Sequence, residues 1–379
     1  MKIVVLAGFA DSLVLFRRHL MAAMARAGHQ VIACAPENNP EIADKLRASG
    51  VIYRPIPLER AGLNPLKDFG FFIRATRFLQ SEKPDLLLCY TIKSVIYGSF
   101  AARLARVPTV YSMITGLGYA FFGQTLRQRI LVRVAPMLYR LALTHSRVVF
   151  FQNPDDRALF VQRGLVRNQN QTVLINGSGV DLDYYAPLPL PPGSPVFLLI
   201  ARMLRDKGVV EYVEAARLLK KKYPHIQFRL VGPFDVNPAS LNPEQVKAWH
   251  DEGVIEHQGW VADVRPALAA ASVFVLPSYR EGTPRTVLEA MAMGRPVITT
   301  DVPGCRETVL NGENGFLVPA KNAGALADAM ERFILSPSVI PEMGLRSRKI
   351  AVEKFDVHQV NAILLRTMGL NDGTQTDTQ

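Results

Sequence analysis

The chain has 379 residues, which is long for one domain and natural for two domains of ordinary size. Hydrophobic residues make up 49% and charged residues 20%, so a large core can form and the composition argues against a disordered chain. The formal net charge of +11 is uneven, because residues 1–180 hold 23 Lys and Arg against 10 Asp and Glu.

The basic half contains a long stretch without acidic residues, from Leu86 through Pro154. Such asymmetry indicates contact with a polyanion or with an anionic membrane. The alternative is a basic surface that is merely solvated.

The N-terminal apolar run Ile3–Ala7 could open a signal peptide. However, the run stops at Asp11, Arg17 and Arg18 follow, and no small-residue cleavage site comes after it. We interpret it as a first buried strand. No apolar run approaches the roughly 18 to 20 residues of a membrane span. We therefore expect a cytoplasmic protein that is soluble or peripheral to a membrane.

In the first half, short apolar runs alternate with amphipathic helical segments such as Leu13–Ala27. Continuous rather than alternating apolar runs are typical of parallel strands that are covered on both faces. The strands we expect are Lys2–Gly8, Gln30–Ala35, Asp85–Tyr90, Thr109–Ile114, Arg147–Gln152 and Thr172–Ile175. Strands that alternate with helices predict a doubly wound α/β domain.

A Pro-rich stretch from Tyr184 to Gly193 interrupts this alternation and is typical of a semi-rigid linker. The alternation then restarts, which predicts a second α/β domain. Its expected strands are Pro195–Ala201, Gln227–Val231, Val254–His257, Ser272–Leu276, Pro296–Thr299 and Phe316–Val318. The segment Ile340–Leu370 has a mainly helical pattern.

The cysteines Cys34, Cys89 and Cys305 lie far apart, and the sequence has no CxxC or Cys/His pattern. This argues against a disulfide framework or a zinc site. We expect three buried thiols in a reducing compartment.

The most informative stretch is residues 277–298, which has the pattern strand end, loop, helix, tight glycine turn and strand. The helix is expected to start near Thr286, where its free backbone N–H groups form an anion site beside a strand end. Glu281 and Glu289 can face the same side if the loop turns tightly at Gly282. Since carboxylates repel a diphosphate, they fit better as acceptors for hydroxyls of ribose and sugar.

A second element follows the first strand of the second domain, where Arg202 and Lys207 flank a strand-to-helix loop. A bidentate guanidinium together with an ammonium is a suitable clamp for a diphosphate leaving group.

The segment Arg127–Leu143 combines four arginines with a high content of apolar side chains, and Tyr119–Phe122 precede it. Such a segment can lie in an anionic membrane surface. The alternative is a buried helix whose arginines reach out to solvent.

Taken together, Arg202, Lys207, the spacing Glu281-x7-Glu289 and residues 289–297 (EAMAMGRPV) resemble the retaining glycosyltransferases of family 4. PGCRETV at 303–309 and NGFLVP at 314–319 fit the same family, and the resemblance covers essentially the whole chain. It implies the α/β GT-B architecture, in which two Rossmann-like doubly wound domains face a central cleft.

The resemblance assigns an acceptor-side domain to residues 1–185, a linker to 186–194 and a nucleotide-sugar domain to 195–355. It also implies a C-terminal helix over 356–370 that crosses back to the first domain. The polar stretch 371–379 is expected to be a flexible tail.

Three further motifs, TGLG at 115–118, REGTPR at 280–285 and PGCRET at 303–308, resemble PglA-like bacterial enzymes. These add a hexose or N-acetylhexosamine to an undecaprenyl-diphosphate-linked sugar. The resemblance therefore implies a nucleotide sugar, with UDP as the nucleotide, and a lipid-linked saccharide as partners. It also implies a peripheral location on the cytoplasmic face of the inner membrane, and no nucleic acid.

The resemblance also implies roles for single residues. The catalytic residues are Arg202 and Lys207, which hold the diphosphate, and Glu281, which contacts donor-sugar hydroxyls, while Glu289 contacts the ribose. The other donor-binding positions are Gly8, Phe9, Val261 (uracil, through its backbone), Gly282, Thr283, Arg285 and Thr286. Thr115 and Lys93 are expected on the acceptor side.

The sequence departs from the family pattern in three places. Gly282-Thr283-Pro284 replaces Gly-Phe-Gly, the first loop has Gly8 without a second adjacent glycine, and Thr115 stands where many members have a histidine. Retention in this family is drawn as front-face attack, in which the leaving phosphate takes the proton of the acceptor. No Asp-x-Asp pattern lies near the site, so we expect neither a metal ion nor another cofactor.

Three other functions remain open at this level. A nucleotide-sugar 2-epimerase has the same fold, but the Arg202, Lys207 and Glu-x7-Glu set argues against it. A Rossmann oxidoreductase fits less well, because no G-x-G-x-x-G follows the first strand. A nucleic-acid binder explains the basic half but not the region around Glu281.

Overall fold

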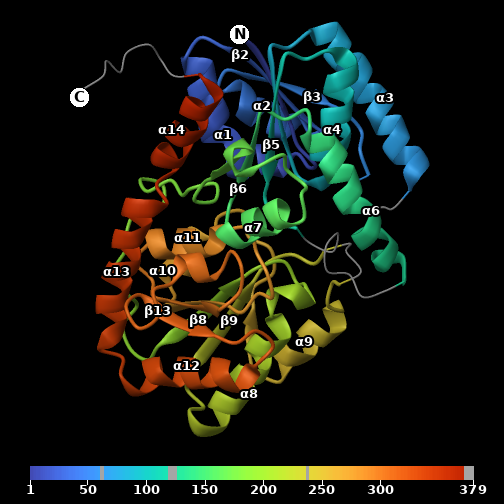
Figure 1. Cartoon of the computed structure of the whole chain (residues 1–379). Coiled ribbons are helices and arrows are strands. Elements are labelled where there is room, and N and C mark those ends of the chain that lie inside the picture. The colour runs from blue at the N-terminus through green and yellow to red at the C-terminus, as the bar shows by residue number, and fades with distance from the viewer. Residues whose placement is uncertain (60–63, 118–125, 236–238, 371–379) are drawn as a thin grey trace. The chain divides into compact units, whose positions relative to one another are not determined.

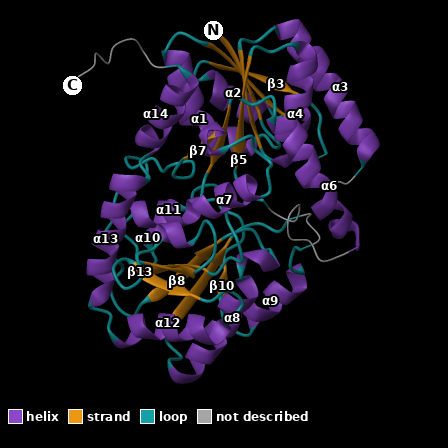
Figure 2. Ribbon diagram, in the orientation of Figure 1, coloured by secondary structure: helices purple, strands orange, loops and turns teal. Residues whose placement is uncertain are grey.

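The computed structural model describes residues 1–59, 64–117, 126–235 and 239–370 (Figure 1). The chain divides into two compact units. The first unit is Met1–Ser178 together with the segment from His358 onward, and the second is Gly179–Val357. Each unit is built around a parallel β-sheet with helices on its two faces (Figure 2).

The sheet of the first unit has the strand order β3-β2-β1-β4-β5-β6-β7, with parallel pairs throughout. Its strands are β1 Lys2–Leu6, β2 Gln30–Ala35, β3 Val51–Pro55, β4 Leu86–Tyr90, β5 Thr109–Ile114, β6 Val148–Phe151 and β7 Thr172–Leu174. Its helices are α1 Asp11–Arg26, α2 Pro40–Arg47, α3 Pro65–Glu82, α4 Ile92–Ala105, α6 Leu126–Leu143, α7 Pro154–Gln162, the 3-10 turn Gln169–Gln171 and α14 Val357–Met368.

Both faces of this sheet are covered, which explains the continuous apolar strands. Ile3 and Val5 of β1 point into a core shared with α1, α2 and α14, whereas Val4 and Leu6 point into a core shared with α3, α4 and α6. The two-residue period of a strand sends alternate side chains to opposite faces, so a strand between two helical layers must be apolar throughout.

The sheet of the second unit has the order β10-β9-β8-β11-β12-β13, again with parallel pairs throughout. Its strands are β8 Val196–Ile200, β9 Gln227–Val231, β10 Glu256–His257, β11 Val273–Leu276, β12 Val297–Thr300 and β13 Gly315–Val318. Its helices are α8 Val209–Lys222, α9 Pro243–Asp251, α10 Arg265–Ala269, α11 Arg285–Ala292, α12 Ala323–Leu335 and α13 Val339–Lys354, with 3-10 turns η2 Arg205–Lys207 and η3 Arg306–Thr308.

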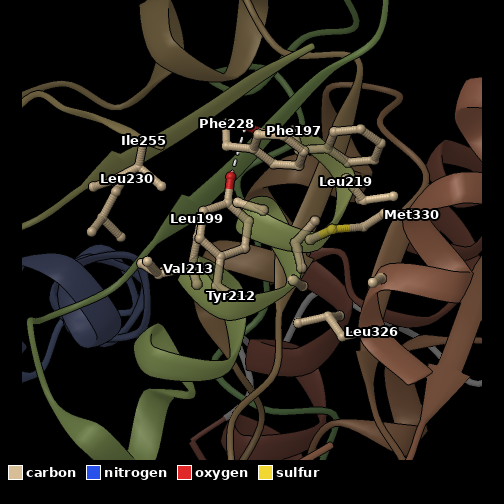
Figure 3. Packing of buried hydrophobic residues seen from close by; sticks show 14 of the residues in the cluster. Phe197, Leu199, Tyr212, Val213, Leu219, Phe228, Leu230, Ile255, Leu326 and Met330 are labelled. Atoms are coloured by element: carbon tan, nitrogen blue, oxygen red, sulfur yellow. Dashed lines mark hydrogen bonds between the residues drawn. The ribbon is translucent and has the colours of Figure 1, made fainter. Parts of the chain in front are cut away.

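One of the two cores of the second unit is shown in Figure 3. Phe197 of β8 and Phe228 of β9 stack with their ring centroids 5.4 Å apart. The buried hydroxyl of Tyr212 donates to the carbonyl oxygens of Phe197 (2.9 Å) and Arg229 (3.0 Å), so its polar end is satisfied. This packing fixes the position of β8, whose carboxyl end carries part of the candidate site.

Each of the twelve expected strands is present with its ends within two residues of the prediction. The sequence analysis missed β3, which pairs only with β2 at the edge of its sheet. Its burial alternates, and it contains Arg54 and Pro55, so it does not have the continuous apolar pattern of the inner strands.

The Pro-rich stretch is not the boundary between the units, which falls at Gly179 rather than at residues 186–194. The guanidinium of Arg295 donates to the carbonyl oxygens of Leu188 (2.8 Å) and Pro189 (3.1 Å), which ties this stretch to the second unit. Carbonyl groups next to prolines lack a regular backbone partner, and here a buried arginine supplies one.

The two ends of the second unit pair with each other. Val180 donates to the Phe355 carbonyl (2.8 Å), and Val357 donates back to the Val180 carbonyl (3.0 Å). Gly179 has φ +72, and a Cβ there would lie 3.0 Å from the backbone nitrogen of Val357. From here α14 returns to the first unit, where Val360 is buried in the core with β1 and α1.

All three cysteines are buried and unbonded, as expected. Burial raises the pKa of the Cys305 thiol to about 12, so it is an unreactive apolar side chain. Among the helices of the described chain, none combines the length and the apolar character that crossing a bilayer requires. The expected tail 371–379 lies outside the described residues.

Candidate functional site

The candidate site lies where the strand order of the second unit reverses. The chain runs outward from β8 to β9 and β10, then returns to the other side of β8 to form β11, β12 and β13. Ligands of doubly wound sheets bind outside the carboxyl ends of the strands at such a switch point. Arg202 and Lys207 follow β8, and Glu281 follows β11, so the fold places all three at the carboxyl ends of these neighbouring strands.

Lys207 and Glu281 are in direct contact although 74 residues separate them. The ammonium of Lys207 forms an ion pair with Oε1 of Glu281, and Ser278 Oγ donates to the same oxygen over 2.7 Å. The two charged side chains are 22% and 13% exposed, so a ligand can still reach them. Two of the predicted catalytic residues thus contact each other, and Ser278, which the sequence analysis missed, joins them.

A glycine lets the Lys207 turn approach β11. Gly208 has φ +71, and a Cβ there would lie 2.7 Å from the carbonyl carbon of Pro277. The backbone N–H of Tyr279 donates to the Asp206 carbonyl (2.8 Å) beside this contact. Since any other residue at 208 meets backbone, the position of Lys207 relative to Glu281 is set by the main chain.

A second glycine holds the loop that carries Glu281. The backbone N–H of Glu281 donates to the Pro303 carbonyl (3.0 Å), which follows β12. Gly304 has φ +85, and a Cβ there would lie 2.5 Å from the carbonyl oxygen of Gly282. The motif PGCRET at 303–308 therefore has a mechanical role in this site, which its sequence alone did not reveal.

Arg202 lies at the same sheet edge and pairs with a partner that the sequence analysis did not consider. Its guanidinium contacts Oδ2 of Asp235, a residue that follows β9. The Arg202 side chain is 39% exposed and that of Asp235 is 15% exposed. The guanidinium has five N–H donors, and the contact with Asp235 is made through one of its terminal nitrogens.

Glu289 is only 5% exposed on α11, and its carboxylate accepts hydrogen bonds from two side chains of the second unit. The Tyr185 hydroxyl donates to Oε1 over 2.8 Å, and Arg285 Nε donates to the same oxygen over 2.7 Å. The sequence analysis gave Arg285 as a donor-binding position and placed Tyr185 at the end of the first domain. Neither side chain was predicted to contact Glu289.

The N-terminus of α11 lies between the two glutamates in sequence. The helix starts at Arg285, one residue before the expected position, with Pro284 at the N-cap and no side chain capping it. Its first-turn backbone N–H groups, including that of Thr286, have the orientation that binds anions. Gly282 and Thr283 form the loop that leads into it, as expected.

Val261 lies in the loop after β10. Its side chain is half-buried and packs against the core cluster that also contains Tyr185 and Val287. The preceding Trp260 is 69% exposed. The expected uracil position and the Glu289 position are therefore attached to one apolar core.

The positions expected in the first unit lie at three strand ends. Gly8 follows β1, and a Cβ there would meet the hydroxyl oxygen of Thr91, which follows β4. Phe9 packs edge to face on Phe16, with centroids 6.5 Å apart. Thr115 is half-buried after β5.

Lys93, in the first turn of α4, is mostly committed to protein partners. Its ammonium forms an ion pair with Asp68 (2.6 Å) and donates to the Glu59 carbonyl (2.8 Å). Its side chain is 16% exposed. This arrangement fits a structural tie between α3 and α4 better than an open cationic site.

Side-chain positions in the segment Arg127–Leu143 are described from Val132 onward, on α6. Ala135, Tyr139 and Leu143 are buried in the core, whereas Met137 is 56% and Leu141 is 52% exposed. Over these residues α6 has both buried and exposed side chains, and a location in a membrane surface stays a prediction. Residues 119–122 lie outside the described part of the chain, as does Gly118 of TGLG.

No cluster of three or more His, Cys, Asp or Glu side chains suited to a metal ion occurs among the described residues. The expectation of a metal-free site stays a prediction.

Comparisons with known proteins identify the family of the chain. A family model described as "Glycosyl transferase 4-like domain" matches residues 15–177, and one described as "Glycosyl transferases group 1" matches residues 194–336. The chain belongs to the family 4 glycosyltransferases. The recognised family and the enzyme class are therefore confirmed.

Two curated relatives transfer sugars in bacteria. The N,N'-diacetylbacillosaminyl-diphospho-undecaprenol alpha-1,3-N-acetylgalactosaminyltransferase of Campylobacter jejuni is 29% identical over 341 residues, 86% of this chain and 88% of the relative. The UDP-Gal:alpha-D-GlcNAc-diphosphoundecaprenol alpha-1,3-galactosyltransferase of Escherichia coli is 27% identical, covering 80% of this chain and 79% of the relative. These matches give no support to the epimerase alternative.

Solved structures share the fold over nearly the whole chain. Anabaena HepE in complex with UDP has a TM-score of 0.77 at 20% identity, covering 97% of this chain and 100% of that one. Sucrose-phosphate synthase from Thermosynechococcus elongatus has a TM-score of 0.79 at 21% identity, covering 97% and 98%. The expected GT-B fold, with two Rossmann-like parallel-sheet domains, is confirmed.

Proposed function

We propose that this glycosyltransferase moves a hexose or N-acetylhexosamine from a UDP-sugar to a saccharide on undecaprenyl diphosphate, with retention of configuration. The observation that carries the proposal is the Lys207–Glu281 pair at the switch point of the second sheet. Support for the substrates comes from the names of the Campylobacter and E. coli relatives and from the UDP bound to HepE.

When the donor binds, its diphosphate exchanges with the carboxylates in the ion pairs of the site. The diphosphate takes the Lys207 ammonium from Glu281 and the Arg202 guanidinium from Asp235. Glu281 is then left to accept hydrogen bonds from hydroxyls of the donor sugar. Prearranged donors that face the leaving phosphate contribute about 3–4 kcal/mol each to lowering the barrier.

The remaining donor groups follow the chain around α11. The backbone N–H groups of its first turn bind a phosphate, Glu289 accepts from the ribose, and the backbone of Val261 contacts the uracil. Phosphate binding at a helix start uses the four unpaired N–H groups and the helix dipole together.

The transfer step needs no base from the protein. The bond between the anomeric carbon and the phosphate oxygen breaks on the same face on which the acceptor oxygen bonds to that carbon. The acceptor proton passes to the leaving phosphate oxygen, so UDP leaves with the charge that Lys207 and Arg202 stabilise. The role of Glu281 is thus to orient the sugar rather than to transfer a proton.

We also propose that the first unit binds an anionic bilayer that holds the lipid acceptor. Leu66 and Phe69 in the first turns of α3 are 82% and 61% exposed, and Met137 and Leu141 on α6 are also exposed. Helix α4 packs against both α3 and α6, so these side chains belong to one helical layer. Apolar side chains on a basic, acid-poor unit suit an anionic lipid surface.

Sedimentation with vesicles tests this membrane surface. We expect binding to phosphatidylglycerol vesicles at low salt and loss of binding in Leu66→Glu/Phe69→Glu. The matched control is Leu345→Glu in the second unit, which is 75% exposed and should leave binding unchanged. Equal binding by both variants, or no binding by the wild type, would contradict the proposal.

A donor screen tests the function itself. Nucleotide release is measured for a panel of UDP-, GDP- and ADP-sugars, with and without an undecaprenyl-diphosphate saccharide. We expect release from one UDP-sugar that depends on the acceptor, and a product whose anomeric configuration by NMR equals that of the donor. Release from a non-uridine donor refutes the nucleotide assignment, and an inverted anomer refutes retention.

A further inference from the structure

A tyrosine hydroxyl that belongs to no known catalytic motif in the sequence lies against Glu289. Tyr185 is 6% exposed, and its hydroxyl donates to Oε1 of Glu289 over 2.8 Å. Arg285, one helical turn before Glu289, donates to the same oxygen through Nε over 2.7 Å. Two donors from distant parts of the chain therefore converge on one carboxylate oxygen.

This arrangement holds the carboxylate of Glu289 at one end only. Both hydrogen bonds end on Oε1, and Oε2 accepts neither of them. An ionised carboxylate has about four lone-pair positions, so it retains the capacity to accept from a ligand hydroxyl. A carboxylate that is 5% exposed also needs compensation for its charge, which Arg285 supplies.

The packing of the core does not require the hydroxyl of Tyr185. The ring lies in the apolar cluster around Val180 and Phe355, a place that a phenylalanine ring would fill equally well. Burial and then the Glu289 charge raise the pKa of Tyr185, so the hydroxyl stays protonated and remains a donor at neutral pH. Its function is therefore to be sought at Glu289.

We propose that Tyr185 is a positioning residue for nucleotide recognition, whose hydroxyl orients Glu289 so that Oε2 accepts a ribose hydroxyl of the donor. This inference rests on the proposed function, in which Glu289 binds the ribose. It assigns ribose selectivity to Tyr185 and Arg285 together with Glu289. An acceptor that is oriented before binding loses less conformational freedom when the ligand arrives.

The neighbouring residue provides a matched control. Tyr184 is 45% exposed, its ring lies 3.9 Å from the Arg265 guanidinium, and its hydroxyl is not a partner of Glu289. Tyr184→Phe therefore removes a hydroxyl from the same segment without changing the carboxylate. Tyr185→Phe removes the proposed contact and keeps the ring that packs in the core.

The experiment compares the affinities of UDP, 2′-deoxy-UDP and 3′-deoxy-UDP by calorimetry for the full-length wild type and both variants. For the wild type, we expect loss of the contacted hydroxyl to weaken binding about 10- to 100-fold, since it bonds to a charged group. For Tyr185→Phe, UDP should bind about 3- to 10-fold more weakly than to the wild type. The deoxy penalty, which is the loss of affinity when the contacted ribose hydroxyl is removed, should shrink to below about threefold. Tyr184→Phe should behave as the wild type.

Two negative results are distinguishable. If Tyr185→Phe keeps the wild-type UDP affinity and the full deoxy penalty, the positioning role is overturned while the ribose role of Glu289 stands. If the wild type binds both deoxy analogues as tightly as UDP, the ribose role of Glu289 in the proposed function fails, and the inference fails with it.

Discussion

Gly304→Ala should damage catalysis without removing any side chain of the site. The new Cβ lies 2.5 Å from the carbonyl carbon of Glu281, and two non-bonded carbon atoms need about 3.5 Å. The loop that carries Glu281 therefore has to move by about 1 Å, and the bond from Glu281 N–H to the Pro303 carbonyl is stretched or lost. Displacements of this size at a reacting centre lower rates about 100-fold.

The matched control is Gly312→Ala. Gly312 has φ +84, close to the +85 of Gly304, but a Cβ there meets no heavy atom within 4 Å. Both variants lose about 1–2 kcal/mol of stability from the left-handed backbone, a fall in Tm of about 2–8 °C. Only Gly304→Ala has the contact with the Glu281 loop in addition.

The assay is UDP release at saturating acceptor, with the melting temperature measured alongside. We expect kcat/KM to fall about 100-fold for Gly304→Ala and less than about twofold for Gly312→Ala. If Gly304→Ala transfers sugar as well as Gly312→Ala does, the loop after β12 does not set the position of Glu281.

Three further changes have expected outcomes. Lys207→Ala should lower kcat/KM about 100-fold or more by removing charge stabilisation of the leaving diphosphate, whereas Lys349→Ala at an exposed position should not; equal rates would contradict the role of Lys207. Excess EDTA should leave initial rates unchanged, and a loss that Mg²⁺ or Mn²⁺ restores would contradict the metal-free site. Arg295→Met should lower the free energy of unfolding by about 2–4 kcal/mol, because carbonyl groups including the buried one of Leu268 and that of Leu188 lose their donor. The control is Arg346→Met at a surface ion pair, which should change the free energy of unfolding, measured by urea titration, by less than about 0.5 kcal/mol. Equal losses for the two variants would contradict the role of Arg295.

The architecture was predictable because parallel strands have a strong signature. β8 and β11 are buried at every position, and buried runs of Val, Leu, Ile and Phe between helical segments have few other interpretations. The edge strand β3 lacks that signature, since only one of its sides is paired. The domain boundary was misplaced because proline content indicates stiffness, whereas packing by Arg295 determines the unit to which the segment belongs.

The site was predictable at the level of which residues gather. Arg202, Lys207 and Glu281 follow adjacent strands, so a parallel sheet necessarily brings their backbone positions to one edge. Their partners were not predictable, because contacts such as that of Asp235 with Arg202 depend on loop conformation and not on spacing. Tyr185 was missed for the same reason, since its contact with Glu289 spans 104 residues.

The central claim is that Glu281 orients the donor sugar while Lys207 and Arg202 hold the diphosphate. Its most direct test is to measure UDP affinity and sugar transfer on the same Glu281→Ala protein. The variant frees the Lys207 ammonium from its ion pair, so UDP should bind within about threefold of the wild type or more tightly. Transfer should fall at least about 100-fold, because the sugar loses its orienting acceptor. A parallel loss of UDP affinity and transfer, or transfer at the wild-type rate, would contradict the account.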